Sequence, residues 1–119
     1  MFCYNGVIEK IIDADTYDIR LDLGFGIYKR DRFRLARINA YEISLKGKTS
    51  IEQKERGIKG KQWCIENLLN KQVIVETVKD KKGKYGRYLA EIKVQEAGII
   101  HFINDDLVLM GFAVFKTYN

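Results

Sequence analysis

The sequence predicts an α+β fold, mainly β, in which five antiparallel strands form a small barrel accompanied by two short helices. Two observations carry this prediction. Short apolar or alternating segments recur along the 119 residues with glycine-marked corners between them, and one helix-length segment separates the first three from the last two. With 46% hydrophobic residues and this length the chain suits one core, so we expect a single domain over residues 1–119.

The first three strands are expected to follow one another directly. Residues 7–12 are apolar and β-branched, and residues 16–23 alternate between apolar and polar side chains. Gly24 and Gly26 supply the conformational freedom of a hairpin loop. Residues 27–38 continue as a third strand that carries a row of arginines on one face. Members of this row are Arg30, Arg32 and Arg34.

A helix and a second hairpin are expected to follow. The polar stretch 44–60 predicts a loop that leads into a helix with Ser50 as a candidate N-cap. The apolar positions of this helix fit a buried face only loosely. They are Ile58, Trp63, Ile65, Leu68 and Leu69. Residues 72–78 and 87–94 predict the fourth and fifth strands, and the charged stretch 79–83 predicts the turn between them.

The end of the chain predicts a second helix and an extended tail. Asn104 is a candidate cap for a short helix through Met110, and Gly111 stands where a helix stop is expected. Residues 112–118 are expected to be extended. This order of elements is typical of the oligonucleotide/oligosaccharide-binding (OB) barrel, although propensity alone fits an open α+β sheet equally well.

Composition narrows the class of protein. The net charge of +5 suits an anionic partner such as nucleic acid, but charge alone does not decide this. Cys3 and Cys64 lie far apart without ligand spacing, which predicts free thiols, and His101 has no companion for a metal site. No apolar run approaches the roughly 18 residues of a membrane span, so we expect no membrane partner. The given chain lacks a signal peptide, which leaves a cytoplasmic location or a secreted one with the signal removed.

Three segments offer chemistry rather than packing. Residues 34–42 begin with an arginine and end in a polar corner that offers the amide oxygen of Asn39 and the carboxylate of Glu42. Residues 13–16 place two carboxylates at a strand corner, and residues 84–87 end a turn in a guanidinium. Carboxylate oxygens suit a hard cation, a carboxylate beside water suits a general base, and guanidinium donors suit phosphate. The segments together predict a metal site, a base and a phosphate clamp.

Each segment alone also has a structural interpretation. An aspartate pair is common at turns, a loop glutamate can be merely solvated, and arginines can form a basic barrel face. Asp13 is expected to order its corner through backbone hydrogen bonds rather than to bind an ion. Arg30, Arg32 and Arg37 fit the basic face better than the site.

The segments IDADT, FRLARINAYE and KYGR, in this order and spacing, resemble the staphylococcal nuclease (thermonuclease) family. The resemblance runs from about residue 7 to residue 118. It implies an OB barrel in which a calcium ion, two arginines and a glutamate hydrolyse phosphodiester bonds of DNA, RNA or both, with single strands preferred. It also implies that Asp15 and Asn39 are metal ligands. The catalytic residues that it implies are Arg34, Glu42 and Arg87. The substrate contacts that it implies are Lys84, Tyr85 and Tyr118.

The sequence departs from the family pattern in two places. Asn39 stands where the family commonly has a second calcium-binding aspartate, and Ala40-Tyr41 replaces a Thr-Pro pair. The chain also ends at Asn119, without the long C-terminal helix of many members. These departures leave an alternative, a weakened OB module that binds single-stranded nucleic acid or a protein partner without cleaving it. An uncovered apolar wall would favour a homodimer.

Overall fold

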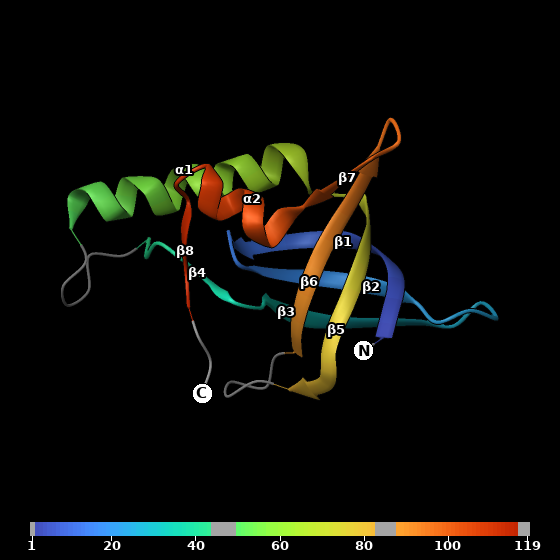
Figure 1. Ribbon diagram of the computed structural model, residues 1–119. Helices are drawn as coiled ribbons and strands as arrows, with labels where there is room; N and C mark the ends of the chain where they lie inside the picture. Colours follow the sequence, from blue (N-terminus) through green and yellow to red (C-terminus); the bar gives the residue numbers. More distant parts are fainter. Residues whose placement is uncertain (1, 44–49, 83–87, 117–119) are drawn as a thin grey trace.

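Five strands form a closed barrel in the computed structural model, which describes residues 2–43, 50–82 and 88–116 (Figure 1). The strands follow the order β3-β2-β1-β5-β6, and β3 pairs with β6 to close the barrel. Their bounds are β1 Phe2–Asp13, β2 Thr16–Asp22, β3 Tyr28–Leu35, β5 Gln72–Lys82 and β6 Tyr88–Glu96. The expected mainly β, OB-like fold is therefore confirmed. One pairing differs from the expectation of a purely antiparallel barrel, because β3 and β6 run parallel.

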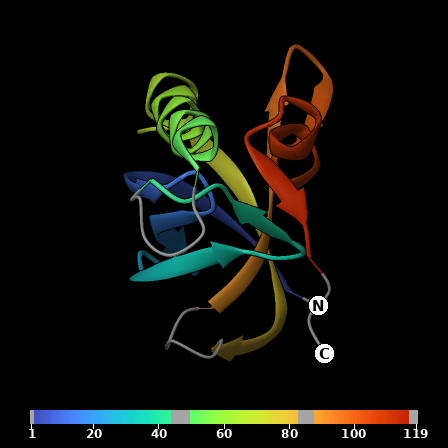
Figure 2. The same ribbon diagram turned by 90° about the vertical axis from the view of Figure 1, so that its left-hand side faces the viewer.

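Three further strands and two helices complete the described structure. They are β4 Ile38–Ala40, α1 Ile51–Asn67, β7 Ile99–Phe102, α2 Ile103–Leu109 and β8 Ala113–Phe115. Strand β7 extends the sheet beyond β6, whereas β4 and β8 form a separate pair. Both helices lie on the same side of the barrel (Figures 1 and 2). No described helix is long and apolar enough to span a membrane.

The expected third strand over residues 27–38 is wrong in one respect, because a turn at residues 36–37 breaks it. Arg37 adopts a positive φ of 68°, which ends the barrel strand and sends β4 toward β8. Two carboxylates hold the Arg37 side chain there, with Nη2 lying 2.6 Å from Glu91 Oε1 and 3.1 Å from Asp105 Oδ1. Tertiary contacts therefore fix a break that the alternating pattern does not reveal.

Helix α1 begins at Ile51, directly after the expected cap. Ser50 forms the expected cap in a reciprocal capping box with Gln53. Ile58 and Ile65, expected on the buried face, are 47% and 37% exposed. Leu68 is buried as expected, and Trp63 and Leu69 pack against the core. The other buried positions of the helix are small residues, namely Gly57, Gly60 and Cys64. The helix can therefore pack its backbone closely against the chain beneath it.

Asn104 lies inside α2 rather than at its cap, so the expected cap is wrong. Phe102 takes the N-cap position without a side-chain hydrogen bond. Asn104 is 1% exposed, and its amide nitrogen donates to the carbonyls of Ala36 and Ala90 at 3.0 Å each. Its amide oxygen accepts from Ile92 N at 3.0 Å. One buried amide thus joins α2 to β6 and to the turn at residues 36–37.

Cys64 and Tyr17 form a polar contact inside the apolar core. The Tyr17 hydroxyl donates to Ala14 O at 2.7 Å and lies 3.4 Å from Cys64 Sγ. Burial is the main reason why the pKa of Cys64 rises to about 12, and burial also raises the pKa of Tyr17. Both groups are therefore neutral in the fold at neutral pH, and Cys64 is a packing residue with a free thiol, as expected.

Exposed apolar side chains gather late in the chain, between residues 99 and 115. They belong to β7, to the end of α2 and to β8. These residues are Ile99, Ile100, Phe102, Leu109, Met110, Val114 and Phe115. Apolar surface of the kind that motivated the dimer is thus present, and the homodimer itself stays a prediction.

Candidate active site

Asp15 lies at the corner between β1 and β2 and ties this corner to the end of β3. Its backbone carbonyl accepts from Leu35 N at 2.8 Å. Its carboxylate is almost fully buried, with Oδ2 accepting from Ala40 N at 2.8 Å and Oδ1 accepting from Thr16 Oγ1 at 3.1 Å. The fold therefore fixes the direction in which this carboxylate points.

Arg34, near the end of β3, directs its guanidinium into the same place. Nη1 donates to the carbonyls of Leu35 at 3.1 Å and Ile38 at 3.0 Å. Nη2 lies 3.4 Å from Asp15 Oδ2 and donates to Asn39 Oδ1. Only 15% of the Arg34 side chain is exposed. The turn after β3 thus supplies carbonyls that orient a guanidinium toward two side-chain oxygens.

Asp15 and Asn39, the two expected metal ligands, are brought together by the fold. Oxygen atoms of both side chains converge on Arg34 Nη2, so a positive charge already lies where they meet. Carboxylate and amide oxygens are hard donors that suit calcium. Within residues 2–43, 50–82 and 88–116, no three His, Cys, Asp or Glu side chains cluster as a metal site. The donor set fits a hard cation, but it holds a single carboxylate.

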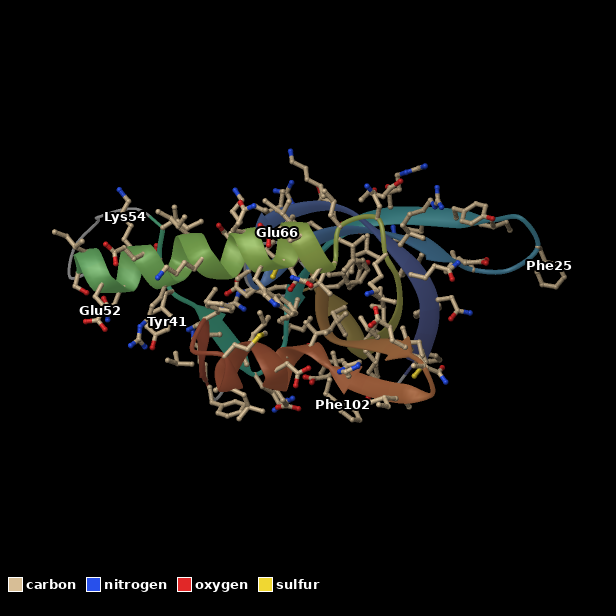
Figure 3. All side chains as sticks on the ribbon, turned by 90° about the horizontal axis from the view of Figure 1, so that it is seen from above. Phe25, Tyr41, Glu52, Lys54, Glu66 and Phe102 are labelled. Carbon is tan, nitrogen blue, oxygen red and sulfur yellow. The ribbon has the colours of Figure 1, made fainter. Side chains whose placement is uncertain are left out.

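Glu42, the expected general base, follows β4 at an exposed corner that α1 supports. A Cβ atom placed on Gly57 would lie 2.5 Å from Tyr41 O and 2.9 Å from Glu42 O. The Arg56 guanidinium lies 5.5 Å from the centre of the Tyr41 ring. Figure 3 shows Tyr41 beside the first turns of α1. The helix therefore sets the position of the corner that bears Glu42.

Four expected site residues lie outside the described part of the chain. They are Lys84, Tyr85, Arg87 and Tyr118. Strand β6 begins at Tyr88, the residue after Arg87 in the sequence, and Tyr88 pairs with Phe33, the neighbour of Arg34.

The other arginines of the basic row form ion pairs on the surface. Arg30 Nε lies 2.9 Å from Glu9 Oε1, and Arg32 Nε lies 2.8 Å from Asp18 Oδ1. Hydrogen bonding to Glu91 is the main reason why the pKa of Arg37 is raised. These contacts agree with the structural interpretation of Arg30, Arg32 and Arg37.

The residues that position the site carry little local signal in the sequence. Gly57 and Arg56 hold the corner at Tyr41, and Ala40 N fixes the Asp15 carboxylate. A glycine inside a helix is the one signal that was visible beforehand, because glycine disfavours helices unless close packing requires it.

A family model described as "Staphylococcal nuclease homologue" matches residues 32–119, well over half of the chain. The chain belongs to this family. The matched stretch begins two residues before Arg34 and contains Asn39 and Glu42. Asp15 precedes it, yet the fold places its carboxylate against Arg34.

The chain is also similar to the uncharacterized protein MJ1439 of Methanocaldococcus jannaschii. The two are 34% identical over 128 aligned residues, which cover 92% of this chain and 58% of that protein. The chain thus spans somewhat more than half the length of this relative.

Proposed function

We propose that this staphylococcal nuclease homologue is a calcium-dependent nuclease that hydrolyses phosphodiester bonds of DNA, RNA or both, with a preference for single strands. The guanidinium of Arg34 carries this proposal. It is held by two carbonyls and two side-chain oxygens, close in the chain to the corner that bears Glu42. Family membership supports hydrolysis as the reaction class.

Asp15 and Asn39 are the residues that would hold calcium. When bound, the ion would polarise a phosphoryl oxygen and offset the charge that grows on it. A site with one carboxylate and one amide attracts a divalent cation less strongly than a site with two carboxylates. We therefore expect this protein to need more calcium than the family norm.

The remaining roles fall to side chains of the chain itself. Arg34, and Arg87 outside the described residues, donate to phosphate oxygens whose charge increases during the reaction. Glu42 accepts a proton from water as the water oxygen attacks phosphorus and the bond to the leaving oxygen breaks. Lys84, Tyr85 and Tyr118 are expected to contact the nucleotide.

A cleavage assay tests the proposal. Purified protein is incubated with single-stranded DNA and with RNA, in calcium or in a chelator. Cleavage should require calcium, and Glu42→Gln should lower turnover by about a hundredfold or more. Glu66→Gln is the matched control, because Glu66 is an exposed carboxylate near the end of α1 that accepts from Gln62 Nε2. Equal activity of wild type and Glu42→Gln would refute the proposed mechanism.

A binding module without catalysis is the second candidate. It is favoured by Asn39, which adds no negative charge, and by the Asp15 carboxylate, which already accepts from Ala40 N and contacts Arg34. Oligonucleotide binding without cleavage at saturating calcium would select this function.

A further inference from the structure

The hairpin that joins β2 to β3 ends in exposed apolar side chains. We call them the tip cluster; its members are Leu23, Phe25, Ile27 and Tyr28, exposed by 42%, 103%, 56% and 54%. Backbone bonds order the tip, with Leu23 N donating to Ile27 O and Ile27 N to Gly24 O, both at 2.9 Å. Figure 3 shows Phe25 at the far end of the hairpin. The apolar side chains of the tip cluster are therefore exposed to solvent and add little buried surface to the fold.

Phe25 also occupies a backbone conformation that suits other residues better. Its φ is 57°, between Gly24 at 82° and Gly26 at 72°. Asparagine or glycine adopts this left-handed conformation with less strain than phenylalanine. Phenylalanine usually avoids both solvent exposure and a positive φ. A residue that adopts both without stabilising the fold is a candidate for a functional role.

Cationic side chains lead from the candidate active site to the tip cluster. Alternate residues of a strand share one face, so Arg32, Arg30 and Tyr28 continue the face of β3 that carries Arg34. The Arg20 guanidinium lies 5.3 Å from the centre of the Tyr28 ring. Glu9 and Asp18 pair with this row, but exposed ion pairs are weak enough for phosphate to replace them.

We propose that the hairpin is a second contact for the nucleic-acid strand that enters the candidate active site. Phe25 stacks on a base, while Arg20 and Arg30 contact phosphates. The substrate class rests on the proposed function. An aromatic ring at the end of a cationic row is the combination that binds single strands without sequence preference. An anionic membrane also accepts apolar tips beside cations, but the continuity of the row with Arg34 favours the strand.

Distance makes the contact depend on substrate length. Six residue steps of β3 separate Tyr28 from Arg34, which corresponds to about 20 Å, and Phe25 lies beyond Tyr28 in the turn. A stacked strand advances by about 3.4 Å per nucleotide, so about 4 nucleotides cannot join the two places and about 20 can.

Fluorescence anisotropy of labelled oligothymidylate tests the hairpin, with Glu42→Gln as the background in calcium so that bound strands stay intact. Phe25→Asn should weaken binding of a strand of about 20 nucleotides about tenfold and leave about 4 nucleotides unaffected. Phe25→Trp should restore binding. Phe102→Asn is the matched control and should leave binding unchanged, since Phe102 on β7 is an exposed ring whose centre lies 5.7 Å from Lys93 Nζ on β6. Arg30→Gln should lower the slope of log affinity against log salt by about 1.

Three outcomes would overturn the second contact: unchanged binding in Phe25→Asn, an equal loss in Phe102→Asn, or binding to phosphatidylserine vesicles that depends on Phe25 while oligonucleotide binding does not. Thermal melting of each variant checks the fold. If oligonucleotide binding depends on Phe25 but the wild-type protein does not cleave, the second contact stands and the proposed nuclease activity is refuted. If the wild-type protein cleaves but binding does not depend on Phe25, the second contact alone is refuted.

Discussion

Arg34 Nη2 lies 3.4 Å from Asp15 Oδ2, inside the group of oxygen atoms that we propose for calcium. The same nitrogen donates to Asn39 Oδ1, so one cationic side chain engages both expected ligands. A metal ion and this guanidinium nitrogen would therefore compete for the same oxygens. Calcium binding should release Nη2 and leave it ready to donate to a phosphate.

Replacing Arg34 should separate metal binding from catalysis. Arg34→Gln removes the competing positive charge, so calcium affinity should increase about tenfold, while cleavage should fall by about a hundredfold or more because a phosphate donor is lost. Calorimetric titration with calcium, without nucleic acid, measures the first effect. Arg32→Gln is the control, because Arg32 pairs with Asp18 instead. Equal or weaker calcium binding by Arg34→Gln would contradict competition at this site.

Asn39→Asp should lower the calcium concentration for half-maximal cleavage by about tenfold. At about 4 Å and an effective dielectric of about 20, two unit charges interact by about 4 kcal/mol before desolvation offsets most of it. The new carboxylate would attract Arg34 as well, but calcium carries twice the charge and gains more. Calcium titrations of both proteins decide this, and coincident curves would mean that Asn39 does not bind the metal.

Local structure was predictable from the sequence where residues close together in the chain determine it. Ser50 and Gln53 form their capping box within one turn, and the hairpin of β2 and β3 follows from alternation and glycine. Arg37 was unpredictable as a break, because its conformation is stabilised by Glu91 and Asp105, far away in the sequence.

The sequence pointed to the residues of the candidate active site, whose roles stay a prediction, but not to the contacts between them. The ordered motifs point to Asp15, Arg34 and Asn39, and the fold brings them together. The engagement of both ligand oxygens by one guanidinium depends on the path of the chain after β3. Similarly, an asparagine near a helix start can cap it or be buried, and the choice at Asn104 depends on partners from other elements.

Gly57→Ala should destabilise the protein although alanine favours helices. A Cβ atom there would lie 2.5 Å from Tyr41 O, a backbone atom that cannot move alone. The strain should cost about 1 to 3 kcal/mol of unfolding free energy and lower turnover by shifting Glu42. Urea unfolding and single-turnover kinetics measure the two effects. Lys59→Ala, at an exposed position of α1, should leave both unchanged. A more stable Gly57→Ala protein would show that α1 does not hold the corner.

Asn104→Ala should destabilise the fold. Removal of the amide leaves two carbonyls and one N–H buried without this partner, at a cost of roughly 2 kcal/mol or more. Asn67→Ala is the control, because Asn67 is exposed and its amide donates to Trp63 O within its own helix. Urea unfolding of both variants should separate them clearly; equal midpoints would mean that water or a rearranged side chain replaces the Asn104 contacts.

Cys64 should make the fold less stable at high pH. Its pKa rises from 9.0 to about 12 on folding, chiefly because the thiol is buried. Between these values the unfolded chain releases the thiol proton while the folded chain keeps it, so stability is complete below pH 9 and falls as pH increases toward 12. One such group contributes roughly 1 kcal/mol per pH unit across this window.

Cys64→Ala should therefore lose less stability than wild type over the same range, whatever its packing defect at neutral pH. Cys3→Ala, at an exposed thiol, is the matched control and should follow wild type. Urea unfolding at successive pH values gives the three curves, and parallel curves for Cys64→Ala and wild type would mean that the thiol ionises equally in both states.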